Sequence, residues 1–451
     1  MLNKRIVGRR TGIKQSPLQN KAFELYADGR ISEALAAAND ILGFSRPDVS
    51  VLNLAAVCHM QLGSHEKAIL CWQQAIRIHP GAAELHNNLG ILLQQQNRQE
   101  EAEAAFRQAI DCQPENSNFQ YNFGYFLQQQ NRLEEAEAAY RQAICVQPDY
   151  ADAHSSLGNL LLGQHRIEEA EAAFRQAIHI QPDHAKAHYN LGGLLHAGDR
   201  FEDAEAAYRE ALAFDPTMSA AIHMLSALRG EKSPCPPERY VRDLFNSYAD
   251  TFEHNLVQNL RYNMPLILRQ AVEQVVGESP VFSRVVDMGC GTGLLGQEFR
   301  PICGHLLGID LAERMVELSG KKAIYDELVH GDIVATLEQK PVGIDLFLAS
   351  DVFVYVGELS SLFQTIRRKA AAGALFAFSV EHLETGDYAL RPSGRYAHSL
   401  EYIQALADEC KFSIILFGTS GLRMDKNGMI PGGVYILRCG DERSTCVNEV
   451  G

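Results

Sequence analysis

Residues 133–148 read LEEAEAAYRQAICVQP, and residues 167–182 repeat nearly the same string as IEEAEAAFRQAIHIQP. The two strings begin 34 residues apart, and prolines recur along the chain with the same period. They stand at Pro80, Pro114, Pro148, Pro182 and Pro216. Because proline lacks an amide hydrogen and cannot continue a helix, this spacing predicts helical units of equal length, each ended by its proline.

Small and aromatic residues follow the same period. Glycines and alanines recur where the two helices of a unit must approach closely, and one aromatic residue per unit fills the space between successive units. The aromatic positions are Trp72, Phe106, Tyr140, Phe174 and Tyr208, and the leading glycines are Gly90, Gly124, Gly158 and Gly192. This pattern resembles the tetratricopeptide repeat over about half of the chain. We therefore expect an α-solenoid over residues 15–229, with about six units and a capping helix near 219–229.

Amides recur on the helix face that lines the concave wall in tetratricopeptide repeats. Asn20, Asn88, Asn122 and Asn190 share one register. A row of amides offers donors and acceptors to an extended peptide backbone, so we expect a protein or peptide partner in this groove. The row is similar to the asparagine ladder in the repeats of O-linked N-acetylglucosamine transferase. The alternative is that asparagine simply belongs to the common N-L-G segment of the repeat.

The helical period ends in a Gly- and Pro-containing stretch, which predicts a linker at residues 230–239. Beyond it, apolar segments alternate with helical segments, a pattern that favours a doubly wound parallel sheet. Seven strands are expected, at 283–288, 305–310, 327–331, 344–350, 373–380, 412–418 and 433–439. Because no crossover helix fits between the last two, we expect the final strand to be antiparallel to its neighbour.

The strongest local motif ends the first expected strand, where residues 285–296 read VVDMGCGTGLLG. Residues 291–296 satisfy the G-x-G-x-x-G of nicotinamide-binding folds, and residues 287–293 resemble the D-x-G-x-G-x-G of class I S-adenosylmethionine-dependent methyltransferases. In the first pattern a glycine should follow the strand directly, whereas here Asp287 and an extra Gly-x pair intervene. A Rossmann-like methyltransferase domain at residues 240–440 is therefore favoured, with a dehydrogenase as the alternative.

The resemblance covers about residues 234–440 and extends to bacterial proteins that join tetratricopeptide repeats to such a domain. It implies S-adenosylmethionine as cofactor, with a glycine loop under the methionine moiety and acidic residues for the ribose and the adenine. The implied residues are Asp287, Gly289, Cys290, Gly291 and Gly293 in the loop, Asp310 and Leu311 after the second strand, Asp332 and Ile333 after the third, and Ala349 and Ser350 after the fourth. The segment Ser350-Asp-Val-Phe lacks the Asn/Asp-Pro-Pro-Tyr of enzymes that methylate planar amino groups, which disfavours amide or base N-methylation.

Tyr248 and Phe252 stand four residues apart and would share one helix face. Their segment resembles the lid helix of small-molecule methyltransferases of the quinone and malonyl-carrier type. A lid there would exclude water from the site. Packing of this helix against the sheet is the alternative.

A polar segment at residues 390–399 follows the fifth expected strand, and we expect a loop at the mouth where substrates enter such sheets. Arg391 and Arg395 there are candidates for holding a carboxylate or phosphate. Tyr396 and His398 are candidates for taking a proton from the acceptor. A purely structural loop is the alternative.

Composition sets the outer limits. Apolar residues make up 46% and charged residues 22%, as in globular proteins, and no apolar run reaches the roughly 18 residues of a membrane span. The net charge of −15 is carried outside a basic tail at residues 1–14, so nucleic acid is not an expected partner. Residues 441–451 are expected to be a polar tail.

Cysteine and histidine usage predicts no metal site. The ten cysteines include no C-x-x-C pair, and His184 and His188 stand four apart without an evident third ligand. Reduced thiols at apolar helix positions indicate a reducing compartment, so a cytoplasmic protein is expected.

Together these patterns predict an S-adenosylmethionine-dependent methyltransferase that acts on a small molecule or a carrier-bound acceptor, with the repeats recruiting a protein partner. The identity of the methyl acceptor stays open. One alternative is a protein methyltransferase whose substrate lies in the repeat groove. Another is an interaction scaffold whose methyltransferase-like domain only senses the cofactor.

Overall fold

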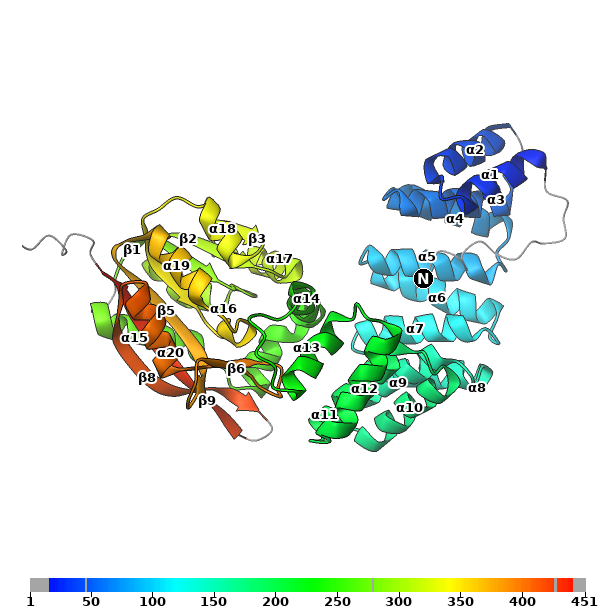
Figure 1. The fold of residues 1–451 in the computed structure, drawn as a ribbon. Helices are drawn as coiled ribbons and strands as arrows, with labels where there is room; N and C mark the ends of the chain where they lie inside the picture. Colours follow the sequence, from blue (N-terminus) through cyan, green and yellow to red (C-terminus); the bar gives the residue numbers. More distant parts are fainter. Residues whose placement is uncertain (1–15, 45–46, 278–279, 426–427, 441–451) are drawn as a thin grey trace, which may run out of the picture. The chain divides into compact units, whose positions relative to one another are not determined.

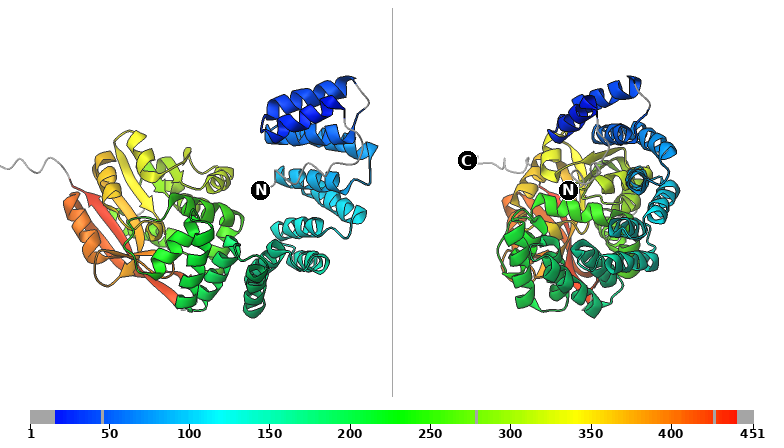
Figure 2. Two further views of the ribbon diagram at one scale, coloured as in Figure 1. Left: turned by 45° about the vertical axis from the view of Figure 1, so that its right-hand side comes forward. Right: turned by 90° about the vertical axis from the view of Figure 1, so that its right-hand side faces the viewer.

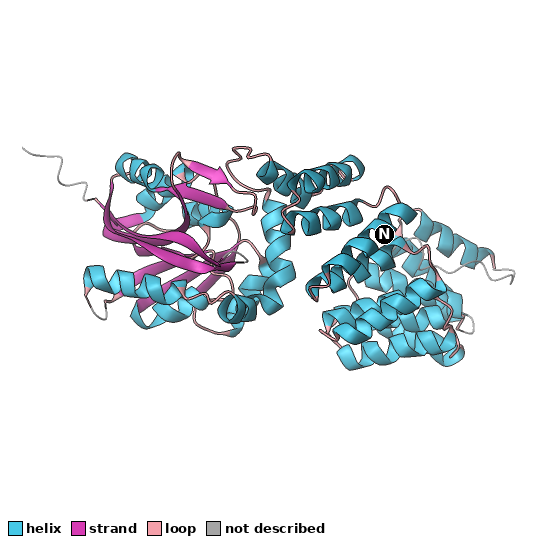
Figure 3. Cartoon of the chain, turned by 90° about the horizontal axis from the view of Figure 1, so that it is seen from below, coloured by secondary structure: helices cyan, strands magenta, loops and turns pink. Residues whose placement is uncertain are grey.

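The computed structural model describes residues 16–44, 47–277, 280–425 and 428–440 (Figure 1). The chain forms two compact units, Met1–Phe214 and Asp215–Gly451. Within the described residues the first unit is entirely helical and the second holds one sheet with its helices, which Figure 3 separates by colour. The predicted fold class, an α-solenoid followed by a Rossmann-like α/β domain, is confirmed. The tails expected at 1–14 and 441–451 lie outside the described residues.

In the part of the chain that is described, the first unit is a stack of helical hairpins, each made of two neighbouring helices that follow the 34-residue period (Figure 2). The pairs are α1 (Pro17–Ala27) with α2 (Ile31–Phe44), α3 (Val49–Gln61) with α4 (His65–Ile78), α5 (Ala83–Gln95) with α6 (Gln99–Cys112), α7 (Ser117–Gln129) with α8 (Leu133–Val146), α9 (Ala151–Gly163) with α10 (Ile167–Ile180), and α11 (Ala185–Ala197) with α12 (Phe201–Phe214). Each second helix ends two residues before its proline, apart from α2, so the prolines act as predicted.

Glycine and the aromatic residue of a hairpin pack directly on each other. A Cβ atom added to Gly158 would lie 2.7 Å from the ring of Phe174, and one added to Gly192 would lie 2.7 Å from Tyr208. The aromatic side chains are buried, and Phe106 also lies 5.4 Å from the ring of Phe126 in the next hairpin. The aromatic residue therefore fills space within its own hairpin as well as between hairpins.

Arginines at the turns connect successive hairpins on the outer surface. Arg132 pairs with Glu103 of the preceding hairpin at 2.7 Å, and Arg166 pairs with Glu137 at the same distance. Each arginine also binds the acidic residue three positions further on. Because these pairs are exposed to solvent, each contributes little to the stability of the stack. They account for much of the regular Glu and Arg content of the repeats.

The second unit contains, in its described residues, a nine-stranded sheet with the order β3-β2-β1-β4-β5-β7-β6, and β9 and β8 extend it beside β5. The strands are β1 (Phe282–Met288), β2 (Cys303–Asp310), β3 (Glu327–His330), β4 (Ile344–Ala349), β5 (Ala370–Leu383), β6 (Tyr388–Leu390), β7 (Tyr396–Ser399), β8 (Phe412–Asp425) and β9 (Gly428–Cys439). β1 to β5 pair in parallel, and β9 is antiparallel to both β5 and β8, as predicted. The short strands β6 and β7 occupy the segment that was expected to be a loop.

Helices cover the sheet on both faces because alternate strand residues point to opposite sides. Val286 and Phe347 join a core beneath α18, α19 and α20, whereas Val285 and Leu346 join another beneath α15 and α16. The helices of this unit are α13 (Ser219–Leu228), α14 (Glu238–His254), α15 (Met264–Val276), α16 (Leu294–Phe299), α17 (Glu313–Lys321), α18 (Ile333–Gln339), α19 (Ser360–Lys369) and α20 (Leu400–Glu409). A π-helical turn (Asn255–Asn259) continues α14.

Helix α13, expected to cap the repeats, makes its contacts in the second unit. His223 on α13 is buried, and its Nε2 donates to the Gly394 carbonyl at 2.8 Å. The segment expected to be a linker is bound as well, because the Pro234 carbonyl accepts from the amides of Gly357 and Glu358. The division between the units thus falls after Phe214, ahead of the stretch that composition marks as a linker.

Candidate functional site

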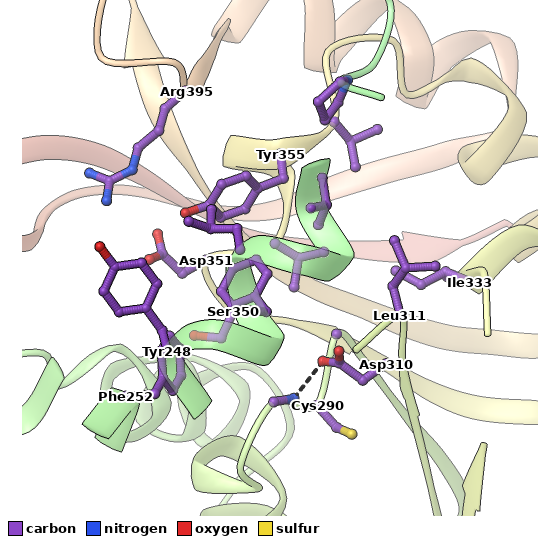
Figure 4. A pocket seen from close by; sticks show the side chains of 18 of the residues that line it. Tyr248, Phe252, Cys290, Asp310, Leu311, Ile333, Ser350, Asp351, Tyr355 and Arg395 are labelled. Carbon is purple, nitrogen blue, oxygen red and sulfur yellow. Dashed lines mark hydrogen bonds between the residues drawn. The ribbon is translucent and has the colours of Figure 1, made fainter. Parts of the chain in front are cut away.

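A cavity of about 810 Å³ lies at the carboxyl ends of β1, β2 and β4 in the second unit (Figure 4). Parallel strands bring their carboxyl ends to one edge of a sheet, where α/β folds bind ligands. The volume suits a small molecule with room for a second. In Figure 4, Asp310, Leu311 and Ile333 lie at one end of the cavity, and Tyr248, Asp351, Tyr355 and Arg395 lie at the other. Ser350 lies between the two ends.

The glycine loop after β1 presents bare backbone to this cavity. Gly289 and Gly291 have φ angles of 71° and 53°, in the left-handed region that favours glycine. A Cβ atom on Gly289 would lie 2.6 Å from Val352, whereas one on Gly291 would meet nothing nearer than the Phe252 ring at 3.8 Å. Any side chain at position 291 would therefore stand inside the cavity.

Asp310 ties the glycine loop to the end of β2. Its two carboxylate oxygens accept from the amides of Gly291 and Ala312, both at 2.8 Å. The residue is only 9% exposed, and burial raises the pKa of its carboxyl. Each oxygen keeps a further lone pair, so Asp310 can also accept hydrogen bonds from a ligand at the cavity.

Asp287 lies behind the loop and does not line the cavity. It is fully buried, and its Oδ2 accepts from the Tyr325 hydroxyl at 2.6 Å. Burial raises the pKa of Asp287 to about 7. Gly293 and Ala349 are also absent from the cavity wall, so these three expected cofactor residues support the wall rather than form it.

At the end of the cavity that contains Asp310, further wall residues come from the segments after β2 and β3. Leu311, Asp332 and Ile333 line it, together with Cys290 of the loop. Asp332 caps α18 through its Oδ1, which accepts from the Ala335 amide at 2.8 Å. This part of the wall is thus apolar with one carboxylate.

Helix α14 both packs against the domain and lines the cavity. Ala249 is buried beside Ala312 and Met315, and ion pairs join Asp250 to Arg314 at 2.9 Å and Glu253 to Lys322 at 2.7 Å. The neighbouring face carries Tyr248 and Phe252, which line the cavity. The helix therefore packs against the domain through one face and lines the cavity with the neighbouring face.

Sequence reasoning missed a buried charge cluster at the second end of the cavity. Asp351 has a φ of 59°, unusual for a residue with a side chain, and its carboxylate pairs with Arg423. Arg423 is 1% exposed and also binds Glu381 at 2.5 Å. Both Asp351 and Arg423 line the cavity. Arg423 stands on β8, 72 positions away in sequence, so no local pattern links the two residues.

Two tyrosines complete this end. The Tyr262 hydroxyl lies 2.6 Å from Ser350 Oγ, and burial raises the pKa of this phenol. Tyr355 lines the cavity, and the Phe245 ring meets it edge-on at 5.0 Å. Aromatic surface therefore surrounds the polar groups of Asp351 and Ser350.

The two arginines expected at the substrate site have different positions. Arg395 lines the cavity, but Arg391 does not. The Arg391 guanidinium donates to the His382 carbonyl and lies 3.9 Å from Glu381. Only Arg395 is placed to meet a ligand.

Tyr396 and His398 were expected on a loop as proton acceptors, and the structure contradicts this. Both stand on β7 with 0% exposure, and neither lines the cavity. His398 Nε2 donates to the Gly357 carbonyl at 2.9 Å, and burial lowers the pKa of the imidazole to about 4. Burial also raises the pKa of Tyr396 to about 12. The error arose because β6 and β7 have only three and four residues, and strands this short cannot be distinguished from a loop in a Gly- and Pro-containing sequence.

In the first unit, the expected asparagine row is partly engaged by its own neighbours. Asn122 Nδ2 donates to Asn87 Oδ1 of the preceding hairpin at 2.9 Å, and Asn88 is 8% exposed. Asn190 is half-buried and Asn20 is exposed. The row therefore presents amides of unequal accessibility.

His184 and His188 do not form a metal site with each other. His184 Nε2 lies 3.1 Å from Asp152, and His188 Nε2 donates to the Pro182 carbonyl at 2.9 Å. Across the described ranges, no three His, Cys, Asp or Glu side chains are grouped to hold a metal ion. None of the helices described there is long and apolar enough to cross a membrane.

Family models match both units. Models of the tetratricopeptide repeat match residues 47–115, 105–138, 124–165 and 155–219, and a model of a methyltransferase domain matches residues 286–378. The chain thus carries tetratricopeptide repeats followed by a methyltransferase domain. No curated protein is a significant match to the chain.

Solved structures resemble each part at low identity. YrrB, a tetratricopeptide repeat protein with an unusual peptide-binding site, is 21% identical, with a TM-score of 0.34, over 42% of this chain and 96% of its own. PilW, a type IV pilus biogenesis factor, is 21% identical, with a TM-score of 0.42, over 47% of this chain and 100% of its own. The magnesium protoporphyrin IX methyltransferase of Synechocystis PCC 6803, solved with SAH, is 19% identical, with a TM-score of 0.36, over 45% of this chain and 99% of its own.

Proposed function

We propose that this chain, which carries tetratricopeptide repeats and a methyltransferase domain, transfers a methyl group from S-adenosylmethionine to a small or carrier-bound molecule. The observation that carries the proposal is the division of one cavity into two ends. Bare glycine backbone and Asp310 form one end, and a separate polar cluster around Asp351 forms the other.

The first end fits the cofactor. Position 291 leaves room that any side chain would fill, Asp310 has lone pairs for ribose hydroxyls, and Ile333 offers apolar surface for a base. Asp332 keeps one carboxylate oxygen beyond the one that caps α18. S-adenosylmethionine supplies an electrophilic methyl group when bound, so the protein has mainly to align an acceptor and exclude water.

At the second end, Asp351 takes the role that Tyr396 and His398 were expected to fill. Its carboxylate is held by Arg423 and faces the cavity, where it can accept the proton of a hydroxyl or amine acceptor. Tyr248 and Phe252 on α14 restrict the access of water. Arg423 is a positioning residue in this scheme, because it acts through Asp351.

The repeats, on this proposal, bind a protein or peptide in the groove that carries Asn88, Asn122 and Asn190. Asn190 supports this role because its side chain is only half-buried, whereas the Asn88 amide is buried and would have to reorient to reach a partner. A partner bound there would bring the acceptor or its carrier to the enzyme. Methylation of the groove-bound protein itself remains the alternative that an experiment must separate.

Transfer of a labelled methyl group into a cell lysate separates these functions. We expect label from S-adenosylmethionine in the small-molecule or carrier fraction with the full-length protein, and none with Gly291→Arg, because that side chain would occupy the cavity. Asp408→Asn on the exposed surface of α20 is the matched control and should keep full transfer. Label in polypeptide that Asn122→Ala abolishes would favour the protein methyltransferase. Absence of label in every fraction would argue against an enzyme.

A further inference from the structure

We propose that the second end of the cavity binds an aromatic or other flat apolar molecule through a single carboxylate, and that Arg395 is the residue that holds this group. The inference rests on the proposed function and names the substrate class for it. Two observations support it: the balance of charged groups around Arg395, and the fixed conformation of the turn that carries Arg395.

Three guanidinium groups and two carboxylates meet at this end. Arg423 is paired with both Asp351 and Glu381, and Arg391 lies 3.9 Å from Glu381 while it donates to a backbone carbonyl. Arg395 lies near these groups, but among the described residues it has no carboxylate within 4 Å. The cluster therefore has one more guanidinium group than carboxylates, and Arg395 at the cavity wall has no direct ion pair among the described residues, which favours an anionic ligand.

The turn that carries Arg395 is held in place before any ligand arrives. Gly394 has a φ of 75°, and its amide donates to the Arg391 carbonyl at 2.9 Å. Its carbonyl accepts from the buried His223 of α13, and a Cβ atom at this position would lie 2.9 Å from Met224. A fixed turn lowers the entropy lost when Arg395 binds its ligand.

The surroundings favour a monoanion over a phosphate. Asp351 and Glu381 stand close enough to act on Arg395 electrostatically, so a second negative charge on the ligand would be repelled. A planar guanidinium also matches a carboxylate in two parallel hydrogen bonds. Asp310 and Asp332 lie at the other end of the cavity, where they accept from backbone amides, and Glu238 and Glu358 also line the cavity.

The body of the ligand would lie among aromatic side chains. Tyr248, Phe252 and Tyr355 line this part of the cavity, and Figure 4 shows the Tyr248 and Tyr355 rings on either side of Asp351. Aromatic walls of this kind bind flat apolar groups through burial and ring contacts. The ligand class that follows is an aromatic monocarboxylate with space for a hydroxyl beside Asp351.

The test measures binding of paired probes by ligand-observed NMR and calorimetry, with the full-length protein. The probes are benzoate, 4-hydroxybenzoate and cinnamate, their primary amides, and phenyl phosphate. We expect the acids to bind at least about tenfold more tightly than their amides, as for a charge-assisted hydrogen bond. Arg395→Gln should remove this preference, and Arg395→Lys should retain part of it. Arg391→Gln, which neutralises an arginine outside the cavity, should change acid binding less than about twofold.

Folding and the cofactor site are checked on the same samples. Thermal unfolding and S-adenosylmethionine affinity should be alike in wild type and Arg395→Gln. The inference would be overturned if acids and amides bound equally well, or if the preference for acids survived Arg395→Gln. It would also be overturned if no acid bound to protein that binds S-adenosylmethionine. Tighter binding of phenyl phosphate than of the acids would also overturn it. If acids bind through Arg395 while S-adenosylmethionine does not bind at all, the carboxylate site stands and the proposed function fails.

Discussion

At the scale of single residues, the two carboxylates behind and beside the glycine loop have different tasks. Asp310 meets the cavity and is stabilised by two backbone amides, whereas Asp287 is sealed behind the loop with one hydroxyl donor. A buried carboxylate with so little compensation favours its protonated form. Asp287 therefore holds the loop at a cost to stability that depends on pH.

The pH dependence follows from the pKa of Asp287, which burial raises from 3.8 to about 7. Between these values the folded protein retains a proton that the unfolded chain has lost, so stability falls as pH rises through this window. At about 1.4 kcal/mol per pKa unit, the loss amounts to at most about 4 kcal/mol. Asp287→Asn should remove this loss, so the stability difference between variant and wild type should shift in favour of the variant from pH 4 to pH 7. Denaturant titrations at several pH values measure it, and parallel curves for the two proteins would contradict the assignment.

At the scale of elements, the solenoid depends on close contact between the two helices of a hairpin. Gly158 on α9 lies against the ring of Phe174 on α10, and no side chain fits between them. Gly163 ends the same helix, and a Cβ atom there would meet nothing within 4 Å. The two glycines therefore form a matched pair in which only one is required by packing.

Alanine substitutions distinguish the two glycines. Gly158→Ala should lower the free energy of unfolding of the repeats by about 1 to 3 kcal/mol, because the ring must shift in a filled core. Gly163→Ala should leave stability unchanged or raise it by up to about 1 kcal/mol, since alanine is the better helix former. Urea unfolding followed by circular dichroism measures both. Equal effects of the two substitutions would show that the glycine-aromatic contact does not limit packing.

The elements also show what the sequence could and could not predict. The 34-residue period predicted the hairpins because each repeat carries its own glycine, aromatic residue and proline. The D-x-G-x-G-x-G motif predicted the glycine loop, and Gly289, Gly291 and Asp310 line the cavity. The charge cluster escaped prediction because Asp351 and Arg423 meet only through the order β4-β5-β9-β8 of the sheet. Strands β6 and β7 escaped because three or four residues carry no recognisable alternation.

At the scale of the whole molecule, the chain consists of a repeat unit and a methyltransferase-domain unit. The boundary between the two units falls after Phe214, whereas composition predicts a linker at residues 230–239. Helix α13 follows the last repeat in sequence, yet His223 binds Gly394, which is 171 positions away. That contact depends on the folded β6–β7 turn, so no local pattern shows it. As a result, helix α13, which precedes the expected linker in sequence, supports the turn that carries Arg395.

Removal of this support should affect the second unit alone. His223→Ala leaves the buried Gly394 carbonyl without its donor, which should lower the stability of the second unit by about 1 to 3 kcal/mol. Hydrogen exchange resolved by peptide should show faster exchange at residues 388–399, with exchange in α5 to α10 unchanged. Faster exchange throughout the repeats would contradict the placement of α13 in the second unit.

The central claim is that the cavity of the second unit binds S-adenosylmethionine on the glycine loop and Asp310, and calorimetric titration tests it most directly. We predict one binding site per chain in the wild type. Asp310→Ala should weaken binding by about 1 to 3 kcal/mol, as expected for unpaired ribose hydroxyls. Gly291→Arg should abolish binding without loss of folding. Absence of binding to the folded wild type, or binding that Gly291→Arg leaves unchanged, would contradict the account.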